Sequence, residues 1–398
     1  MATLLLIIIY LAFISLGLPD SLLGAAWPVM QSDLGAPLEM AGFLFMTIAG
    51  GTILSSLVSG KALKRFGTGK VTFFSTLMTA GAILGFSFAP SVMWLFLFAI
   101  PLGLGAGAID AGLNDYVAAH YKAHHMSWLH SFWGVGATLG PVIMAQYIAG
   151  QNSWSSGYFV IAGIQFVLAV ILLFTLPLWG KVKSSQNVSQ DKQGRKESLG
   201  HEEQEKKKPL QIKGVKLALA SFLFYCGVEA TMGLWGSSYL VNIKGLTAAD
   251  AAQWVSLYYG GITIGRFVTG FITFKVNNVT LIRAGQIIAL CGTILLLLPL
   301  PSIFALAGFM LVGFGLAPIF PCMLHETPAR FGKKHSQTIM GYQMAVAYTG
   351  STFLPPLIGF IASQSTIQTL PLCMVVFVAA MYLSTEKLNQ RDGSPASL

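Results

Sequence analysis

The chain has 398 residues, of which 54% are hydrophobic and 10% are charged, and its formal net charge is +9. Soluble domains average about 25% charged residues, so this composition excludes an ordinary soluble globular protein. The four cysteines lie in four separate apolar stretches, without the spacing of a zinc site or a disulfide framework. We therefore expect neither a bound metal nor disulfide bonds.

The apolar residues form twelve blocks, each of about the length that crosses the roughly 30 Å of hydrocarbon in a bilayer. The blocks span residues 4–30, 40–60, 70–89, 91–118, 126–149, 156–179, 215–241, 250–274, 279–298, 301–325, 336–362 and 366–385. The first block lacks the positively charged start of a signal peptide and is longer than one, so it counts as a spanning helix. The sequence predicts an all-α integral membrane protein with twelve transmembrane helices.

The positive charges lie mainly on one side of the predicted membrane. If the N-terminus is cytoplasmic, 22 of the 24 Lys and Arg residues fall in inner loops or tails, Lys244 falls in an outer loop and Arg266 lies within a block. Cytoplasmic loops carry such an excess of cations. We predict a multi-pass protein of the plasma (inner) membrane with both termini in the cytoplasm, in contact with lipid and not with nucleic acid.

One long polar segment, residues 181–213, separates the sixth block from the seventh. Its composition is that of a solvated linker, so we expect a cytoplasmic tether between an N-terminal half (1–180) and a C-terminal half (214–398). The halves are weak repeats of each other, since the Gly-x-Gly at residues 103–105 is echoed at residues 313–315. Six-helix repeats with a site at their interface are typical of secondary transporters.

The predicted helix at residues 91–118 carries polar side chains within apolar sequence. Asp110 and Asn114 are four residues apart and share one face. An ionised carboxylate costs roughly 2.5 kcal/mol or more at the bilayer centre, so these groups should face a watery cavity. Apolar surroundings favour a neutral carboxyl group, which suits Asp110 to proton coupling and Asn114 to substrate binding; a polar contact between helices is the alternative. Asp115 lies nearer the helix end, where we expect a gate or cap contact with Lys122 or another loop cation.

Two further groups flank this helix. Asp20 follows Gly17-Leu-Pro19, a sequence that breaks a helix and leaves backbone groups for neighbours or water to satisfy. We predict a second proton-coupling carboxylate at Asp20, with a structural cap as the alternative. His130 begins the helix that follows, where it could bind substrate, pair with Asp110 or serve only in packing.

The C-terminal half contains two charges within its apolar blocks, Glu229 and Arg266. A buried unpaired Arg is costly, so we expect these residues to form an ion pair that is either structural or part of the substrate site and its gate. Trp235, Tyr259 and Gln343 could bind a sugar, because aromatic faces stack on sugar C–H groups and amides bond hydroxyls. Packing between helices is the alternative for each of them.

The loop after the second block reads GKALKRFG and, together with twelve helices and a central linker, resembles the major facilitator superfamily over essentially the whole chain. The loop motif of that family is G-x-L-A-D-R-x-G-R-R/K. This chain keeps Gly60, Arg65 and Gly67 but has Lys64 at the acidic position. The resemblance implies the major facilitator fold, with this loop at a gate against the eleventh helix and another residue replacing the missing acid.

Within the superfamily, two helices resemble the fucose–galactose–glucose:proton symporter family. The sequence DAGLN at residues 110–114 is similar to the E-T-A-A-N-P motif of that family, which has an acidic residue four before an Asn. The sequence LHSFWGVG at residues 129–136 is similar to L-A-Q-T-F-N-S-F-G, with His130 in place of Gln, and Asp20 matches an Asp in the first helix of the family. The resemblance implies uptake of a sugar with a proton.

These observations predict a secondary active transporter with alternating access that moves a small sugar or polyol with a proton, sodium being the alternative ion. A proton-driven exporter of drugs or metabolites in the same fold is the main alternative, and a membrane sensor that binds a sugar without moving it is another. The sequence contains no nucleophile–base pair, metal-ligand cluster or ATP-binding loop, so we expect no enzyme activity and no cofactor. We also expect a monomer.

Overall fold

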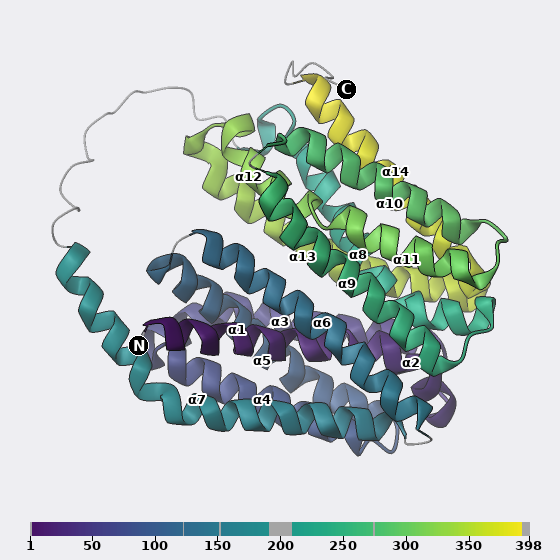
Figure 1. Ribbon diagram of the computed structural model, residues 1–398, viewed down its shortest axis with the longest axis horizontal. Coiled ribbons are helices and arrows are strands. Elements are labelled where there is room, and N and C mark those ends of the chain that lie inside the picture. The colour runs from purple at the N-terminus through teal and green to yellow at the C-terminus, as the bar shows by residue number, and fades with distance from the viewer. Residues whose placement is uncertain (1, 122, 151–152, 191–208, 274, 392–398) are drawn as a thin grey trace.

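The computed structural model describes residues 2–121, 123–150, 153–190, 209–273 and 275–391. These residues form two bundles of helices that lie side by side (Figure 1). The N-terminal bundle contains α1 (Ala2–Asp20), α2 (Leu22–Asp33), α3 (Met40–Phe66), α4 (Thr68–Ser87), α5 (Val92–His120), α6 (Ala123–Ala149) and α7 (Trp154–Gln190). The C-terminal bundle contains α8 (Val215–Lys244), α9 (Ala248–Ile272), α10 (Asn278–Leu297), α11 (Ser302–Leu316), α12 (Ile319–Phe331), α13 (Lys333–Gln364) and α14 (Leu370–Arg391), with short 3₁₀ helices η1 (Pro209–Gln211) and η2 (Ile367–Thr369).

Each bundle contains one pair of helices that together make a single broken span. The break between α1 and α2 falls at Asp20 and Ser21, and the break between α11 and α12 falls at Ala317 and Pro318. Pro19 and Pro318 contribute to these breaks, because proline lacks a backbone N–H and its ring clashes with the preceding turn of a helix. With each pair counted once, both bundles have six spans, which confirms the predicted twelve-helix membrane fold in two halves.

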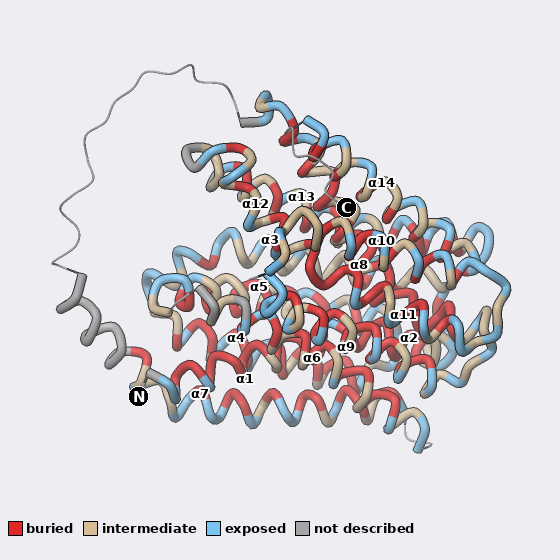
Figure 2. The backbone as a smooth tube through the Cα atoms, turned by 45° about the horizontal axis from the view of Figure 1, so that its top comes forward, coloured by how far each residue is buried: buried red, intermediate tan, exposed pale blue. Residues whose placement is uncertain are grey.

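Most of these helices are apolar enough to face lipid. In the described part of the chain, eleven helical stretches are long and apolar enough to cross a membrane; α9 is not among them. α9 packs against α6 of the other half and against α11, so protein covers much of its more polar surface. Large apolar side chains such as Leu57, Phe174 and Phe271 are exposed on the outside, and buried and exposed positions alternate along α7 (Figure 2). Such an apolar exterior is expected for a surface in contact with a membrane.

The linker is shorter than the sequence suggested. Helix α7 continues to Gln190, so residues 181–190 are helical rather than linker, and η1 and α8 begin again at Pro209 and Val215. The sequence KVKSSQNVSQ at 181–190 contains neither Pro nor Gly, so no residue interrupts the helix after its apolar part ends. The rest of the predicted linker, residues 191–208, lies outside the described residues.

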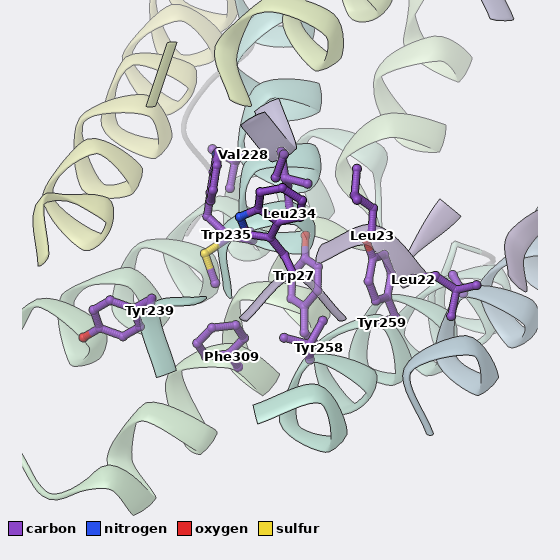
Figure 3. Close-up of a cluster of buried hydrophobic side chains, with 14 of the residues drawn as sticks. Leu22, Leu23, Trp27, Val228, Leu234, Trp235, Tyr239, Tyr258, Tyr259 and Phe309 are labelled. Carbon is purple, nitrogen blue, oxygen red and sulfur yellow. The ribbon is translucent and has the colours of Figure 1, made fainter. Parts of the chain in front are cut away.

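The two halves are packed together at the end of the molecule away from the linker, which we call the far end; the opposite end is the linker end. A cluster of buried side chains fills the far end: Leu22, Leu23, Trp27, Val228, Leu234, Trp235, Tyr239, Tyr258, Tyr259 and Phe309 (Figure 3). The backbones of α2 and α8 touch here, since a Cβ added at Gly24 would lie 2.1 Å from the carbonyl oxygen of Gly233. Next to this contact, the Ser237 hydroxyl donates a hydrogen bond to the carbonyl of Ala25 across 3.3 Å. Small residues therefore allow the close approach that seals the far end.

Replacing Gly24 with alanine should open the far end. The added methyl group overlaps the backbone of α8, and overpacking of this kind costs about 1–3 kcal/mol, enough to shift a two-state equilibrium by about tenfold. We expect a cysteine placed at the buried Ser237 to react about tenfold faster with a membrane-impermeant maleimide, in a background without the four native cysteines. Gly50→Ala is the matched control, because a Cβ there meets open space. Equal labelling in the two variants would contradict this account.

Candidate functional site

A cavity lies between the two halves and has two adjoining compartments, of about 920 Å³ and about 650 Å³. The larger compartment reaches the linker end, where it is lined by Asn278 at the start of α10 and Glu326 on α12. The smaller one extends toward the far end and stops at Gly24 and Gly233. Residues of both halves line both compartments: Asp20, Thr52, Asp110, His130, Trp133, Glu229, Phe320 and Tyr348. The cavity is thus open at the linker end and closed at the far end.

Asp20 lies at the break between α1 and α2, as the sequence predicted. Because the helix stops there, the carboxylate faces the cavity at mid-depth instead of lying along a continuous helix face. The indole Nε1 of Trp133 on α6 donates a hydrogen bond to the Asp20 Oδ2 across 2.7 Å. A charge-assisted bond of this length is strong. It holds the carboxylate without neutralising it.

Asp110 and Asn114 lie on one face of α5, which confirms the predicted spacing. The Asn114 amide donates to the Asp110 carboxylate and to the Asp110 backbone carbonyl, both across 2.9 Å. Tyr348, from α13 of the other half, lines the cavity with Asp110 and interacts with its carboxylate electrostatically. Asp110 therefore has two neutral polar neighbours, one from each half of the protein.

His130 faces the cavity from α6, and its ring meets the edge of the Phe13 ring at 5.8 Å. The sequence left open a pairing of His130 with Asp110, but in the structure the carboxylate of Asp110 accepts its side-chain hydrogen bond from Asn114. The imidazole is left facing the cavity, where a substrate hydroxyl could reach it.

Glu229 and Arg266 form the predicted ion pair, with 3.1 Å between the guanidinium and carboxylate. Their side chains are 18% and 15% exposed, toward the cavity. Arg266 also donates to the Tyr225 hydroxyl across 3.3 Å, and its guanidinium lies 5.7 Å from the centre of the Trp133 ring. These contacts offset the cost of removing an arginine from water.

Among the cavity residues that the sequence did not predict, two lie beside the acids. Trp133 contacts both Asp20 and Arg266, and Tyr348 contacts Asp110. Trp133 is three residues after His130 and so shares its helix face, which was a usable signal. Nothing in the local sequence around Tyr348 distinguishes it from an aromatic residue in the helix core.

The structure corrects two of the predicted sugar-binding residues. Trp235 is fully buried at the far end, where its indole N–H donates to the carbonyl of Pro355 across 2.7 Å. Gln343 is 1% exposed and accepts a hydrogen bond from Thr327 on α12 across 3.0 Å. Both helices turn these side chains toward neighbouring helices, so they stabilise packing and do not line the cavity. Tyr259 does line the smaller compartment.

Of the predicted gate residues, Arg266 lines the cavity, and the other four lie at the linker end outside it. Gly67 joins α3 to α4 with a positive φ of 80°, a conformation that favours glycine. Gly60 and Arg65 are exposed, and Arg65 lies over the ring of Phe66 at 5.3 Å. Asp115 is exposed on α5, and its proposed partner at residue 122 lies outside the described residues. Their gating roles stay predictions.

The charges of the cavity wall are predominantly acidic. Asp20, Asp110, Glu229 and Glu326 line it, against the single guanidinium of Arg266 among the described lining residues. A low-dielectric cleft with one sign of charge disfavours ligands of that sign. In the described part of the chain, no group of three His, Cys, Asp or Glu residues could hold a metal ion. The cavity is therefore suited to a neutral, hydroxyl-bearing or cationic ligand.

Two six-span halves around a central cavity that contains charged side chains define a membrane transporter. The chain belongs to the Major Facilitator Superfamily, whose family model matches residues 9–355 and, in a second match, residues 217–396. The fold predicted from the loop motif and the helix count is thereby confirmed.

Relatives and solved structures agree with this assignment. The chain is 25% identical to the "Bypass of stop codon protein 6" of Saccharomyces cerevisiae, over 93% of this chain and 79% of that protein. It is 22% identical to the glucose/mannose transporter GlcP of Bacillus subtilis, over 98% of this chain and 96% of that protein. A solved D-xylose–proton symporter superposes with a TM-score of 0.73 at 12% identity, over 96% of each chain, which shows the shared fold.

Proposed function

We propose that the protein is a symporter that carries a small neutral sugar or polyol together with a proton. The observation that carries the proposal is the pair of carboxylates, Asp20 and Asp110, which face the cavity and accept hydrogen bonds from the neutral donors Trp133 and Asn114. A carboxylate without a cationic partner gains most from taking up a proton when its surroundings become dry. Such a group can load a proton while the cavity is open and release it on the other side.

The polar groups around these acids support the proposed substrate class. Asn114, His130 and Tyr259 offer an amide, an imidazole and a phenol to hydroxyl groups. The acidic cavity disfavours an anionic ligand. A relative named as a glucose/mannose transporter supports the same class of substrate.

The proposed cycle uses the opening observed here as one of its two end states. We propose that the linker end faces the cytoplasm of a cell's plasma membrane, so that this structure faces inward. Closing the cavity around two ionised acids would be costly, because buried charges lose their hydration. A proton and a bound polyol remove that cost together, and neither does so alone. This requirement for both couples the two fluxes.

Uptake into proteoliposomes tests the proposal. Labelled glucose, mannose, xylose and mannitol would be supplied with an inward proton gradient, with the gradient collapsed by an ionophore, and with an inward sodium gradient in its place. Accumulation of one of these compounds that depends on the proton gradient is the expected result. Accumulation with sodium alone would replace the proton by sodium, and no movement of any polyol would overturn the substrate class.

A second candidate, an exporter of amphipathic compounds, is favoured by the apolar part of the cavity wall. Phe13, Leu16, Phe45, Phe320 and Met344 line it beside the polar groups. Proton-dependent extrusion of a cationic dye from the same vesicles, without polyol uptake, would establish this function instead.

A further inference from the structure

Trp133 touches the acid of one half and the ion pair of the other. Its indole N–H donates to Asp20 across 2.7 Å, and the face of its ring lies 5.7 Å from the guanidinium of Arg266. Arg266 in turn is paired with Glu229 at 3.1 Å. A series of side-chain contacts therefore links the two halves. It runs from Asp20 on α1 through Trp133 on α6 and Arg266 on α9 to Glu229 on α8.

The backbone holds Trp133 firmly against α1. A Cβ added at Gly17 would lie 2.1 Å from the carbonyl oxygen of Trp133, so α1 and α6 are in direct backbone contact one helical turn before Asp20. On the other side of Trp133, the side chain of Thr263 on α9 would lie 2.4 Å from a Cβ at Gly134. The backbone of α6 at this point is therefore packed against both α1 and α9, while the indole itself faces the cavity.

We infer that Trp133 transmits the charge of Asp20 to the Glu229–Arg266 pair and thereby couples proton uptake to the relative movement of the two halves. An ionised Asp20 orients the indole through a charge-assisted hydrogen bond, and this orientation presents the ring face to Arg266. Protonation of Asp20 weakens that bond, which frees the indole and with it the contact between the halves. The inference deepens the proposed proton symport and rests on it.

Other charged and titratable groups surround Asp20 and have to be separated from Trp133 in the test. Asp110 on α5 and Tyr259 on α9 interact with Asp20 electrostatically. His130 on α6, Glu229 on α8 and Arg266 on α9 line the same cavity. Of these groups and the described contacts, only Trp133 is bonded to Asp20 and also touches the ion pair of the C-terminal half.

Indole fluorescence provides the first test, and it requires no substrate. The purified protein in nanodiscs would be titrated with acid, and the emission of wild type compared with that of Trp133→Phe and Asp20→Asn. We expect a pH-dependent component of the emission that is absent from both variants. Trp179→Phe is the matched control, because in the described structure the buried indole N–H of Trp179 has no hydrogen-bond partner. A pH response that persists in Asp20→Asn would overturn the inference.

Transport provides the second test, with two readouts that a merely structural role would move together. Trp133→Phe keeps an aromatic face but removes the N–H donor. We expect exchange of labelled for unlabelled substrate to stay near the wild-type rate, while proton-driven accumulation falls by about tenfold, within the usual range of coupling between sites. Equal loss of exchange and accumulation, or no loss of either, would overturn the inference. If wild-type transport shows no proton dependence, the proposed symport is wrong. The fluorescence titration then shows separately whether Trp133 responds to the charge of Asp20.

Discussion

We expect the replacement of Asp110 with asparagine to abolish uphill uptake while leaving exchange of substrate across the membrane. Asparagine matches the carboxylate in size and can still meet Asn114 and Tyr348, but it cannot take up a proton. One pH unit across the membrane supplies about 1.4 kcal/mol per proton, which supports an accumulation of about tenfold. In the variant, the ratio of internal to external substrate should fall toward one, because Asp110 no longer carries a proton with the substrate.

The measurement is the steady-state accumulation ratio in proteoliposomes, with counterflow in the same vesicles to show that the carrier still turns over. Asp250→Asn is the control variant, since this carboxylate lies outside the cavity and accepts a hydrogen bond from the Thr247 hydroxyl at the start of α9. Unchanged accumulation in Asp110→Asn would remove Asp110 from the coupling mechanism. If Asp20→Asn were also unchanged, proton symport through these acids would be wrong.

Removing Arg266 alone is expected to destabilise the protein more than removing both members of its ion pair. Arg266→Leu leaves Glu229 as an uncompensated charge beside the cavity, and breaking a buried pair on one side costs about 3 kcal/mol or more. Water in the cavity keeps the cost near the lower end of that range, since both side chains are partly exposed. The double variant Glu229→Gln/Arg266→Leu removes both charges and should recover most of the lost stability.

Unfolding in detergent by denaturant, followed by circular dichroism, measures this difference. A cycle of the two single variants and the double variant separates the interaction energy of the ion pair from the loss of packing by each side chain. Uptake in the double variant then separates stability from function. A stable double variant that no longer accumulates substrate would show that the pair also acts in transport, whereas normal accumulation would show that it is only structural. Equal stability of Arg266→Leu and the double variant would mean that an unpaired Glu229 does not destabilise the protein.

Several features of the site followed from local sequence. The four-residue spacing of Asp110 and Asn114 determines that they share a helix face wherever the helix lies. The sequence Gly17-Leu-Pro19 predicted the broken helix at Asp20, because the backbone of proline cannot continue the hydrogen-bond pattern. The pairing of Glu229 with Arg266 followed from the cost of an unpaired buried arginine. Each of these inferences depends on neighbours in the chain or on a general energetic cost.

Other features depend on how the helices are rotated against one another. Trp235 and Gln343 are plausible sugar ligands by residue type, but α8 and α13 turn them toward Pro355 and Thr327. Tyr348 was not distinguishable from a packing residue until α13 was placed against α5. A period of 3.6 residues shows which side chains lie together on one helix, but it does not show which neighbour that face meets.

The sequence by itself therefore determined the twelve spans, the two halves and the acids that need a watery surrounding. Span length and charge placement follow from the thickness and low dielectric of the bilayer, which act on each segment separately. Only the tertiary structure decided that the cavity opens at the linker end and that Trp133 joins Asp20 to Arg266. Those contacts join residues more than one hundred positions apart, and helix packing, rather than local sequence, brings them together.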